Sequence, residues 1–183
     1  MCKPARLFEK QCLALIFAVL LPTLILGQSQ TADQLPKIMG ESLTGHQVVL
    51  PDDALGKVTV LIFGFSKNSK NANNAWARKI SADFSGQTSL AVYQLPVIES
   101  APRFIRGMII SSMRKDVPEN MRDRFVPLVK DEGTLKAFVN YKEPDDAYVV
   151  VLDRSGKVMK QAHGQLSDAT YSEIRQKIEA LLK

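Results

Sequence analysis

The sequence predicts a three-layer α/β fold, in which a mixed central sheet carries a helical insertion between a βαβ half and a ββα half. Two almost entirely apolar runs, 58–63 (VTVLIF) and 148–152 (YVVVL), are rich in β-branched residues. Such runs are typical of central strands that are covered on both faces. Amphipathic segments with helical spacing stand between and after these runs. A single domain of ordinary size, residues 39–183, accommodates all of them.

The first half of this domain has the pattern of a βαβ unit. A short strand is predicted at 47–50, before the buried strand 58–63. The segment 71–84 places Trp76 and later apolar residues at helical spacing, and a further strand follows at 90–95. A right-handed crossover would lay the strands on either side of the helix parallel to each other.

The insertion and the second half follow in order. A helix is predicted at 103–115, and Pro118 fits the first turn of a short helix that runs to residue 125. After the strand 148–152, a turn at 153–156 leads into an edge strand at 157–162. The last helix is capped by one of two adjacent candidates, Ser167 or Asp168.

Residues 1–27 have the pattern of a secretory signal peptide. Basic residues precede an uncharged apolar run at 13–27, which is shorter than the ~20 residues that a bilayer span requires. Two alternatives stay open, a cleaved signal and an uncleaved membrane anchor. We therefore expect export to the periplasm or the exterior, or attachment to a membrane. Residues 28–38 are predicted to be a flexible lead-in.

Composition limits the chemistry of the domain. Both cysteines, Cys2 and Cys12, lie in the predicted signal, so the domain itself carries no thiol. The net charge of +5 is only mildly basic and does not favour nucleic-acid binding. Two histidines far apart, His46 and His163, do not predict a metal site or a serine–histidine pair. We expect no cofactor, no metal and no catalytic residue.

Two segments of the domain carry a resemblance, LTGHQVVLPDDALGKVTVLIFGFS at its start and DAYVVVLDRSGKVMKQAHGQLSDATYSEI at its end. The first is similar to the opening half, and the second to the closing half, of redoxins, the thioredoxin-like proteins. The middle string FIRGMIISSMRKDVPENMRDRF, with Trp76 ahead of it, resembles the thioredoxin-like assembly factors of the mitochondrial F-type ATP synthase. The resemblance implies a thioredoxin-like fold without redox cysteines and a role in assembly.

The loop after the first buried strand is where redoxins place a low-pKa thiolate. Here Ser66 and Ser69 have the spacing of the two redox cysteines, but a hydroxyl cannot form a disulfide. Redoxins also use a cis-proline about six residues before the turn aspartate, a position that Ala147 occupies in this chain. The loop is a degenerate redox loop, and its amides and lysines fit either an anion or plain solvent. Asp145 and Asp146 are interpreted as turn residues.

The insertion is the predicted partner-binding surface. Methionines make adaptable contacts and arginines are enriched at interface hot spots. The candidate residues are Arg106, Met108, Met113, Arg114, Lys115, Arg122 and Arg124. Among them we expect the guanidinium groups of Arg114, Arg122 and Arg124 to be the more exposed. The alternative is a structural lid, whose methionines fill core gaps and whose charges pair locally.

We therefore expect a non-catalytic binding or assembly factor, with a chaperone-like action on a membrane-associated protein client. The alternative is a divergent redoxin-type envelope protein, similar to a peroxiredoxin or a thiol oxidoreductase, that depends on the thiols of another protein.

Overall fold

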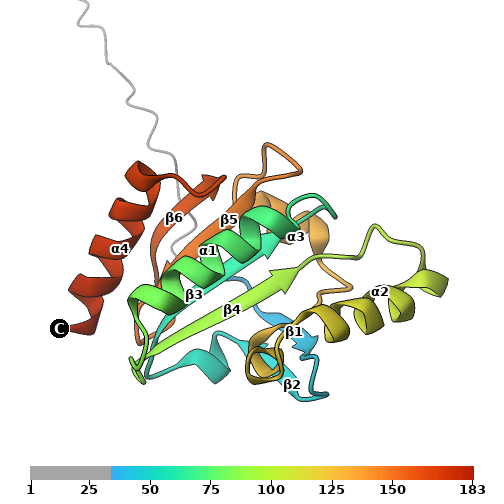
Figure 1. The fold of residues 1–183 in the computed structure, drawn as a ribbon, viewed down its shortest axis with the longest axis horizontal. Helices are drawn as coiled ribbons and strands as arrows, with labels where there is room; N and C mark the ends of the chain where they lie inside the picture. The colour runs from blue at the N-terminus through green and yellow to red at the C-terminus, as the bar shows by residue number, and fades with distance from the viewer. Residues whose placement is uncertain (1–33) are drawn as a thin grey trace, which may run out of the picture.

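A computed structural model describes residues 34–183, so the predictions made for residues 1–27 lie outside the described residues. Its centre is a four-stranded mixed sheet in the order β4-β3-β5-β6 (Figure 1). β3 (Val58–Gly64) runs parallel to β4 (Leu90–Pro96) and antiparallel to β5 (Ala147–Leu152), which pairs in turn with β6 (Val158–Gly164). Every residue of β3 and of β5 is buried, as their apolar sequences predict. The predicted fold class is confirmed.

Helices α1 (Lys70–Asp83) and α4 (Asp168–Leu182) cover one face of this sheet. Trp76 of α1 is fully buried in that layer, and its indole nitrogen donates to the Gly164 carbonyl oxygen at 3.1 Å. Trp76 is thus a packing residue that joins α1 to the end of β6. At the start of α4, the Ser167 side chain accepts a hydrogen bond from the Thr170 N–H, which identifies Ser167 as the cap.

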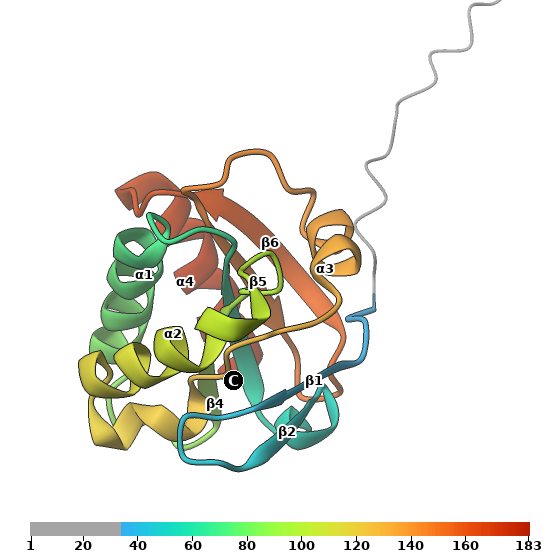
Figure 2. The same ribbon diagram turned by 90° about the vertical axis from the view of Figure 1, so that its right-hand side faces the viewer.

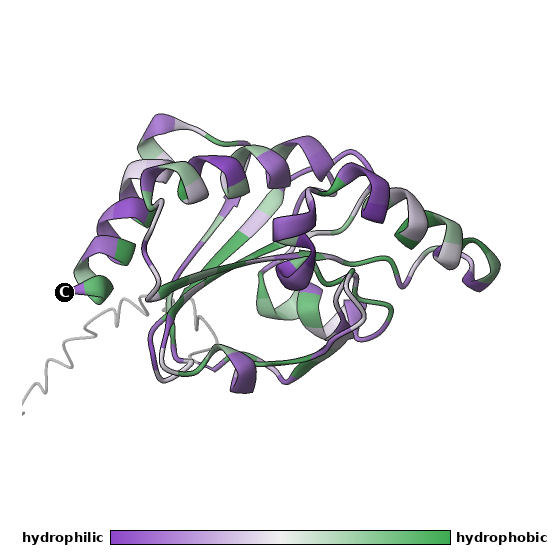
Figure 3. Ribbon diagram, turned by 60° about the horizontal axis from the view of Figure 1, so that its bottom comes forward, coloured by the Kyte–Doolittle hydropathy of each residue, from purple (hydrophilic) through white to green (hydrophobic). Residues whose placement is uncertain are grey.

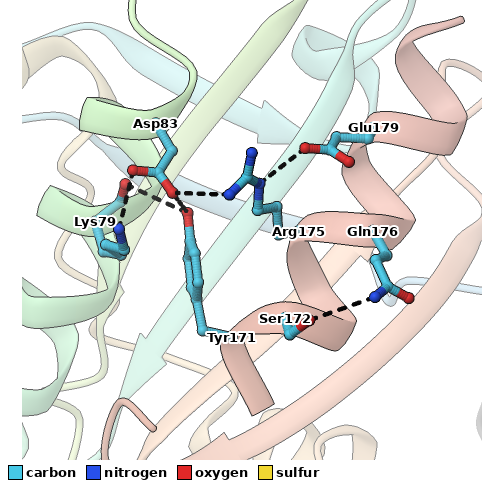
Figure 4. Close-up of polar contacts among 7 residues, drawn as sticks. All are labelled: Lys79, Asp83, Tyr171, Ser172, Arg175, Gln176 and Glu179. Atoms are coloured by element: carbon cyan, nitrogen blue, oxygen red, sulfur yellow. Dashed lines mark hydrogen bonds and ion pairs between the residues drawn. The ribbon is translucent and has the colours of Figure 1, made fainter. Parts of the chain in front are cut away.

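A polar cluster joins α1 to α4 at the solvent edge of their interface (Figure 4). The Tyr171 hydroxyl donates to Asp83 at 2.8 Å, and the Lys79 ammonium lies 3.0 Å from the same carboxylate. Arg175 approaches Asp83 at 4.0 Å and bonds Glu179 at 2.8 Å. The hydrogen bond from Tyr171 and then that from Lys79 lower the pKa of Asp83. Burial, together with the bond to Asp83, raises the pKa of Tyr171.

The opposite face of the sheet is covered by a hairpin and a short helix (Figure 2). The hairpin consists of β1 (Ile38–Glu41) and β2 (Gln47–Leu50), and the helix is α3 (Glu132–Phe138). Leu35 and Ile38 are buried in this layer, so the described part of the predicted lead-in 28–38 packs against the core.

The insertion lies beyond the β4 edge of the sheet (Figure 1). It contains α2 (Arg103–Asp116) and, where a short helix to residue 125 was predicted, a six-residue 3-10 helix, η2 (Glu119–Arg124). After η2 the chain returns alongside β4, with bridges from Gln94 to Phe125 and from Val97 to Leu128. Another 3-10 turn, η1 (Asp52–Ala54), lies earlier in the chain, just after the hairpin. The return covers the β4 edge, whereas no residue of α2 is buried.

Candidate functional site: a groove beside the serine loop

The segment between β3 and α1, residues 65–69, is called the serine loop here. The Ser66 hydroxyl donates to one carboxylate oxygen of Asp145 at 2.8 Å and accepts from the N–H groups of Asn68 and Ser69 at 3.0 and 3.1 Å. The side-chain amide of Asn68 donates to the other carboxylate oxygen of Asp145 at 3.2 Å. The Ser69 hydroxyl, almost fully buried, donates to the Ser66 carbonyl oxygen at 2.8 Å. The loop is therefore closed by its own hydroxyls and by one carboxylate.

The hydrogen bonds of the loop bear on the charge that position 66 can carry. A carboxylate in hydrogen-bond contact with position 66 disfavours a second negative charge there, whereas a redox thiol needs the charged form. Both serine hydroxyls donate to protein oxygens. The two histidines bond elsewhere: His163 lies 3.0 Å from Asp146, and His46 lies 2.7 Å from Asp123.

The sequence interpretation of Asp145 as a turn residue missed its contact with the serine loop. In the register of β3 with β5, Gly64 faces Ala147. If this register is continued beyond the strand ends, Phe65 faces Asp146 and Ser66 faces Asp145. This neighbourhood follows from the predicted sheet, so the pair Asp145–Ser66 could have been found by aligning the two strand ends.

A groove of about 650 Å³ opens between the serine loop, the first turns of α1 and the insertion. Met113 and Ile109 of α2 line one side, and Val97 beyond β4 lines the other. At one end of the groove an ion pair of 2.7 Å joins Lys70 of α1 to Asp116 of α2. Large apolar hollows with a few polar groups are the usual form of a binding site. The remaining apolar lining comes from Phe65, Ala77, Pro96, Ile98, Ala101, Val117, Pro118, Met121 and Phe125.

The outer surface of α2 is also apolar in part. Phe104 is 88% exposed and Met108 is 67% exposed, one helical turn apart. Figure 3 shows hydrophobic and hydrophilic residues interspersed along this helix at the right of the view. Because Ile109 and Met113 face the groove while Phe104 and Met108 face solvent, α2 presents apolar side chains in two directions.

The predicted partner-binding residues separate into distinct environments. Three arginines bond backbone carbonyl oxygens: Arg106 bonds Ala101 at 2.8 Å and also Glu99, Arg114 bonds Leu43 at 2.9 Å, and Arg122 bonds Val117 at 3.0 Å. The bond of Arg114 joins α2 to the loop of the β1–β2 hairpin, whereas the bonds of Arg106 and Arg122 run to residues close by in the chain.

The remaining predicted residues differ in exposure. Lys115 and Arg124 are exposed, Met108 lies on the outer surface, and Met113 lines the groove. Of the three arginines expected to be the more exposed candidates, Arg114 and Arg124 are exposed, whereas Arg122 is half-buried and less exposed than Met108. A role of these residues in partner binding stays a prediction.

Two further points concern residues 34–183 only. None of the helices in this part of the chain is long and apolar enough to span a bilayer. Nor do three or more His, Cys, Asp or Glu side chains of the same residues converge as ligands of a metal ion would.

Neither a known protein family nor a curated protein matches the chain in sequence. Solved structures do match it in fold. A protein described as the thiol:disulfide interchange protein DsbE from Chlorobium tepidum is 19% identical, with a TM-score of 0.56 over 82% of this chain and 96% of that one. A SCO1/SenC family lipoprotein from Bacillus anthracis is 16% identical, with a TM-score of 0.56 over 82% and 95%.

The protein BsSco, described as a member of the Sco family of cytochrome c oxidase assembly proteins, is 12% identical. Its TM-score is 0.56 over 81% of this chain and 93% of that one. Similarities at this level of identity establish a thioredoxin-like fold. Function has to be argued from the residues of the site.

Proposed function

We propose that the chain is a non-catalytic, thioredoxin-like binding protein that holds a polypeptide client in the groove between the serine loop and the insertion. The observation that carries the proposal is the groove itself, which is about 650 Å³, lined mainly by apolar side chains and located where redoxins carry their thiols. A binding protein of this kind would act as an assembly or chaperone-like factor for a membrane protein complex.

The absence of catalysis is part of the proposal. Residues 34–183 contain no cysteine, and Asp145 occupies the position next to Ser66 where a thiolate would need positive surroundings. Assembly work on this fold has a precedent in BsSco, which is described as a cytochrome c oxidase assembly protein. An ATP synthase-like client rests only on the sequence string 104–125 and stays a prediction.

A second candidate function is that of a divergent redoxin-type envelope protein. The similarity in fold to a thiol:disulfide interchange protein favours it, although that similarity is at 19% identity. Such a protein would need thiols from a partner or from Cys2 and Cys12. For either function, the apolar run 13–27 and the fold shared with a SCO1/SenC lipoprotein support export or membrane attachment.

Site-specific photocrosslinking in intact cells tests the proposal. A benzophenone amino acid replaces Ile109, which lines the groove, in the full chain. The matched control replaces Leu55, which is 53% exposed at the end of η1 and does not line the groove. We expect a protein adduct from position 109 and none from position 55. No adduct from position 109, or the same adduct from both positions, would contradict the proposal.

A further inference from the structure

We infer that the client segment is acidic as well as apolar: a stretch of polypeptide whose Asp or Glu carboxylates pair with Lys67 and Lys70. This inference rests on the proposed function, because it specifies the chemistry of the client for the same groove. It follows from the unequal charge of the groove lining.

The ionisable residues of the groove are mainly cationic. Lys67, Lys70 and Arg78 line it, and Asp116 is the one acidic residue that does so. Asp116 is already paired with Lys70 at 2.7 Å. In the part of the chain that the structure describes, Lys67 and Arg78 form no ion pair, so two cations remain available to an occupant.

The start of α1 adds to this positive field. Its first turn contains no acidic side chain, so the negative charges near the positive end of its dipole come from other segments, namely Asp116, which pairs with Lys70, and Asp145, which is bonded to the serine loop. Lys70 is the first residue of α1, and Lys67 is three residues earlier in the serine loop. Both lysines therefore lie within one helical turn of the start of α1 along the chain.

The groove walls select for the rest of the occupant. Ile109 and Ile98 are partly exposed and offer apolar surface, and Met113 offers a side chain that adapts to irregular shapes. A basic segment would place its charges against the two unpaired cations, Lys67 and Arg78, and an acidic segment without apolar residues would leave these walls uncovered. Asp116 competes with the client for Lys70, so removing its charge should favour an acidic client.

Short fluorescent peptides test the inference with the purified full chain. Three probes share one set of apolar residues and differ only in carrying Glu, Gln or Lys at the same positions. We expect binding in the order Glu, Gln, Lys, with about a tenfold difference in Kd between the first and the last. Added salt should narrow this difference, because it screens exposed charges.

Three variants locate the effect. Lys67→Glu should remove the preference for the Glu peptide, and Asp116→Asn should tighten its binding. The control Lys57→Glu carries the same change of charge on an exposed residue before β3, at the far end of that strand from the serine loop. It should bind as the unmodified chain does. Circular dichroism establishes that each variant is folded.

Several outcomes would overturn the inference: equal binding of the three probes, tighter binding of the Lys peptide, no binding of any probe, or an unchanged preference in Lys67→Glu. Competition of the Glu peptide by phosphatidylglycerol vesicles would assign the cations to a membrane surface and overturn it as well. If position 109 still crosslinks a protein in any of these cases, the proposed function stands and only the acidic character of the client is wrong.

Discussion

The carboxylate of Asp145 limits what position 66 could do even if a thiol were placed there. In a chain with Cys2→Ser and Cys12→Ser, we expect Ser66→Cys with Ser69→Cys to give thiols that react with iodoacetamide no faster than an ordinary thiol of pKa about 8.5. Adding Asp145→Asn should speed alkylation at neutral pH by up to about tenfold, because it removes the neighbouring negative charge.

The matched control for this experiment is Asp146→Asn. Asp146 is adjacent in the chain but bonds His163 rather than the serine loop. Alkylation rates are measured by mass spectrometry across neutral pH. Fast alkylation of the double cysteine variant with Asp145 intact would show that the carboxylate does not restrain the thiol.

The pair Asp83–Tyr171 predicts how stability depends on pH. The pKa of Asp83 is lowered from 3.8, so its stabilising effect is present above that value and is lost as the pH falls through the folded-state pKa. The pKa of Tyr171 is raised from 10.0, so its contribution is present below that value and is lost as the pH rises further. Tyr171→Phe should flatten the stability profile at both ends.

Thermal unfolding of Tyr171→Phe and of a control, Tyr141→Phe, at acid, neutral and alkaline pH checks this prediction. Tyr141 lies outside the α1–α4 cluster and packs against Phe65. Parallel profiles for the unmodified chain and Tyr171→Phe would mean that the hydrogen bond to Asp83 does not couple to folding.

At the scale of elements, the hairpin depends on a close approach between β1 and the return segment. A Cβ atom on Gly40 would lie 2.6 Å from a methyl carbon of Val126. Gly40→Ala should therefore destabilise the protein by about 1–3 kcal/mol, the usual cost of overpacking. The control Gly107→Ala has open space around it within α2 and should not lower stability. Urea unfolding midpoints compare the two, and equal midpoints would contradict the expectation.

No residue of α2 is fully buried, and a hydrogen bond from Arg114 joins this helix to the β1–β2 hairpin. Arg114→Ala removes the bond to the Leu43 carbonyl oxygen, and Lys115→Ala is the matched control on the same turn. We expect faster amide hydrogen exchange in α2 only for Arg114→Ala, with global stability changed by less than about 0.5 kcal/mol. Unchanged exchange would mean that other contacts fix the helix.

The sequence predicts best the strands in which every residue is apolar and buried. The β-branched runs of β3 and β5 are apolar throughout, so their place at the centre of the sheet could be predicted. β1 and α3 are short and contain Gly40 and Gly133, so neither has a readable period. They form because they pack against an apolar face of the sheet. That contact is with residues distant in the sequence, so the local sequence pattern does not predict it.

The candidate site was predictable in one of its two parts. The serine loop follows from its position after β3, and its loss of thiols is visible in Ser66 and Ser69. The groove is not visible, because it depends on α2 standing away from the body while η2 and the return segment close around it. The same arrangement explains why Arg106 and Arg122 bond carbonyl oxygens instead of lying free at the surface.

The whole molecule is similar in fold to a thiol:disulfide interchange protein, yet residues 34–183 contain no thiol. We expect the full chain to leave insulin unreduced in the presence of dithiothreitol beyond the rate of a blank, because its only cysteines precede the domain. Cys2→Ser with Cys12→Ser should give the same rate and the same adduct from position 109.

Reduction that disappears in this double variant would instead establish the redoxin-type alternative, with the two N-terminal cysteines as its thiols. Insulin reduction that persists in the double variant would require a group other than the two cysteines. If the double variant reduces insulin no faster than the blank but still gives the adduct from position 109, client binding on this fold is independent of redox activity.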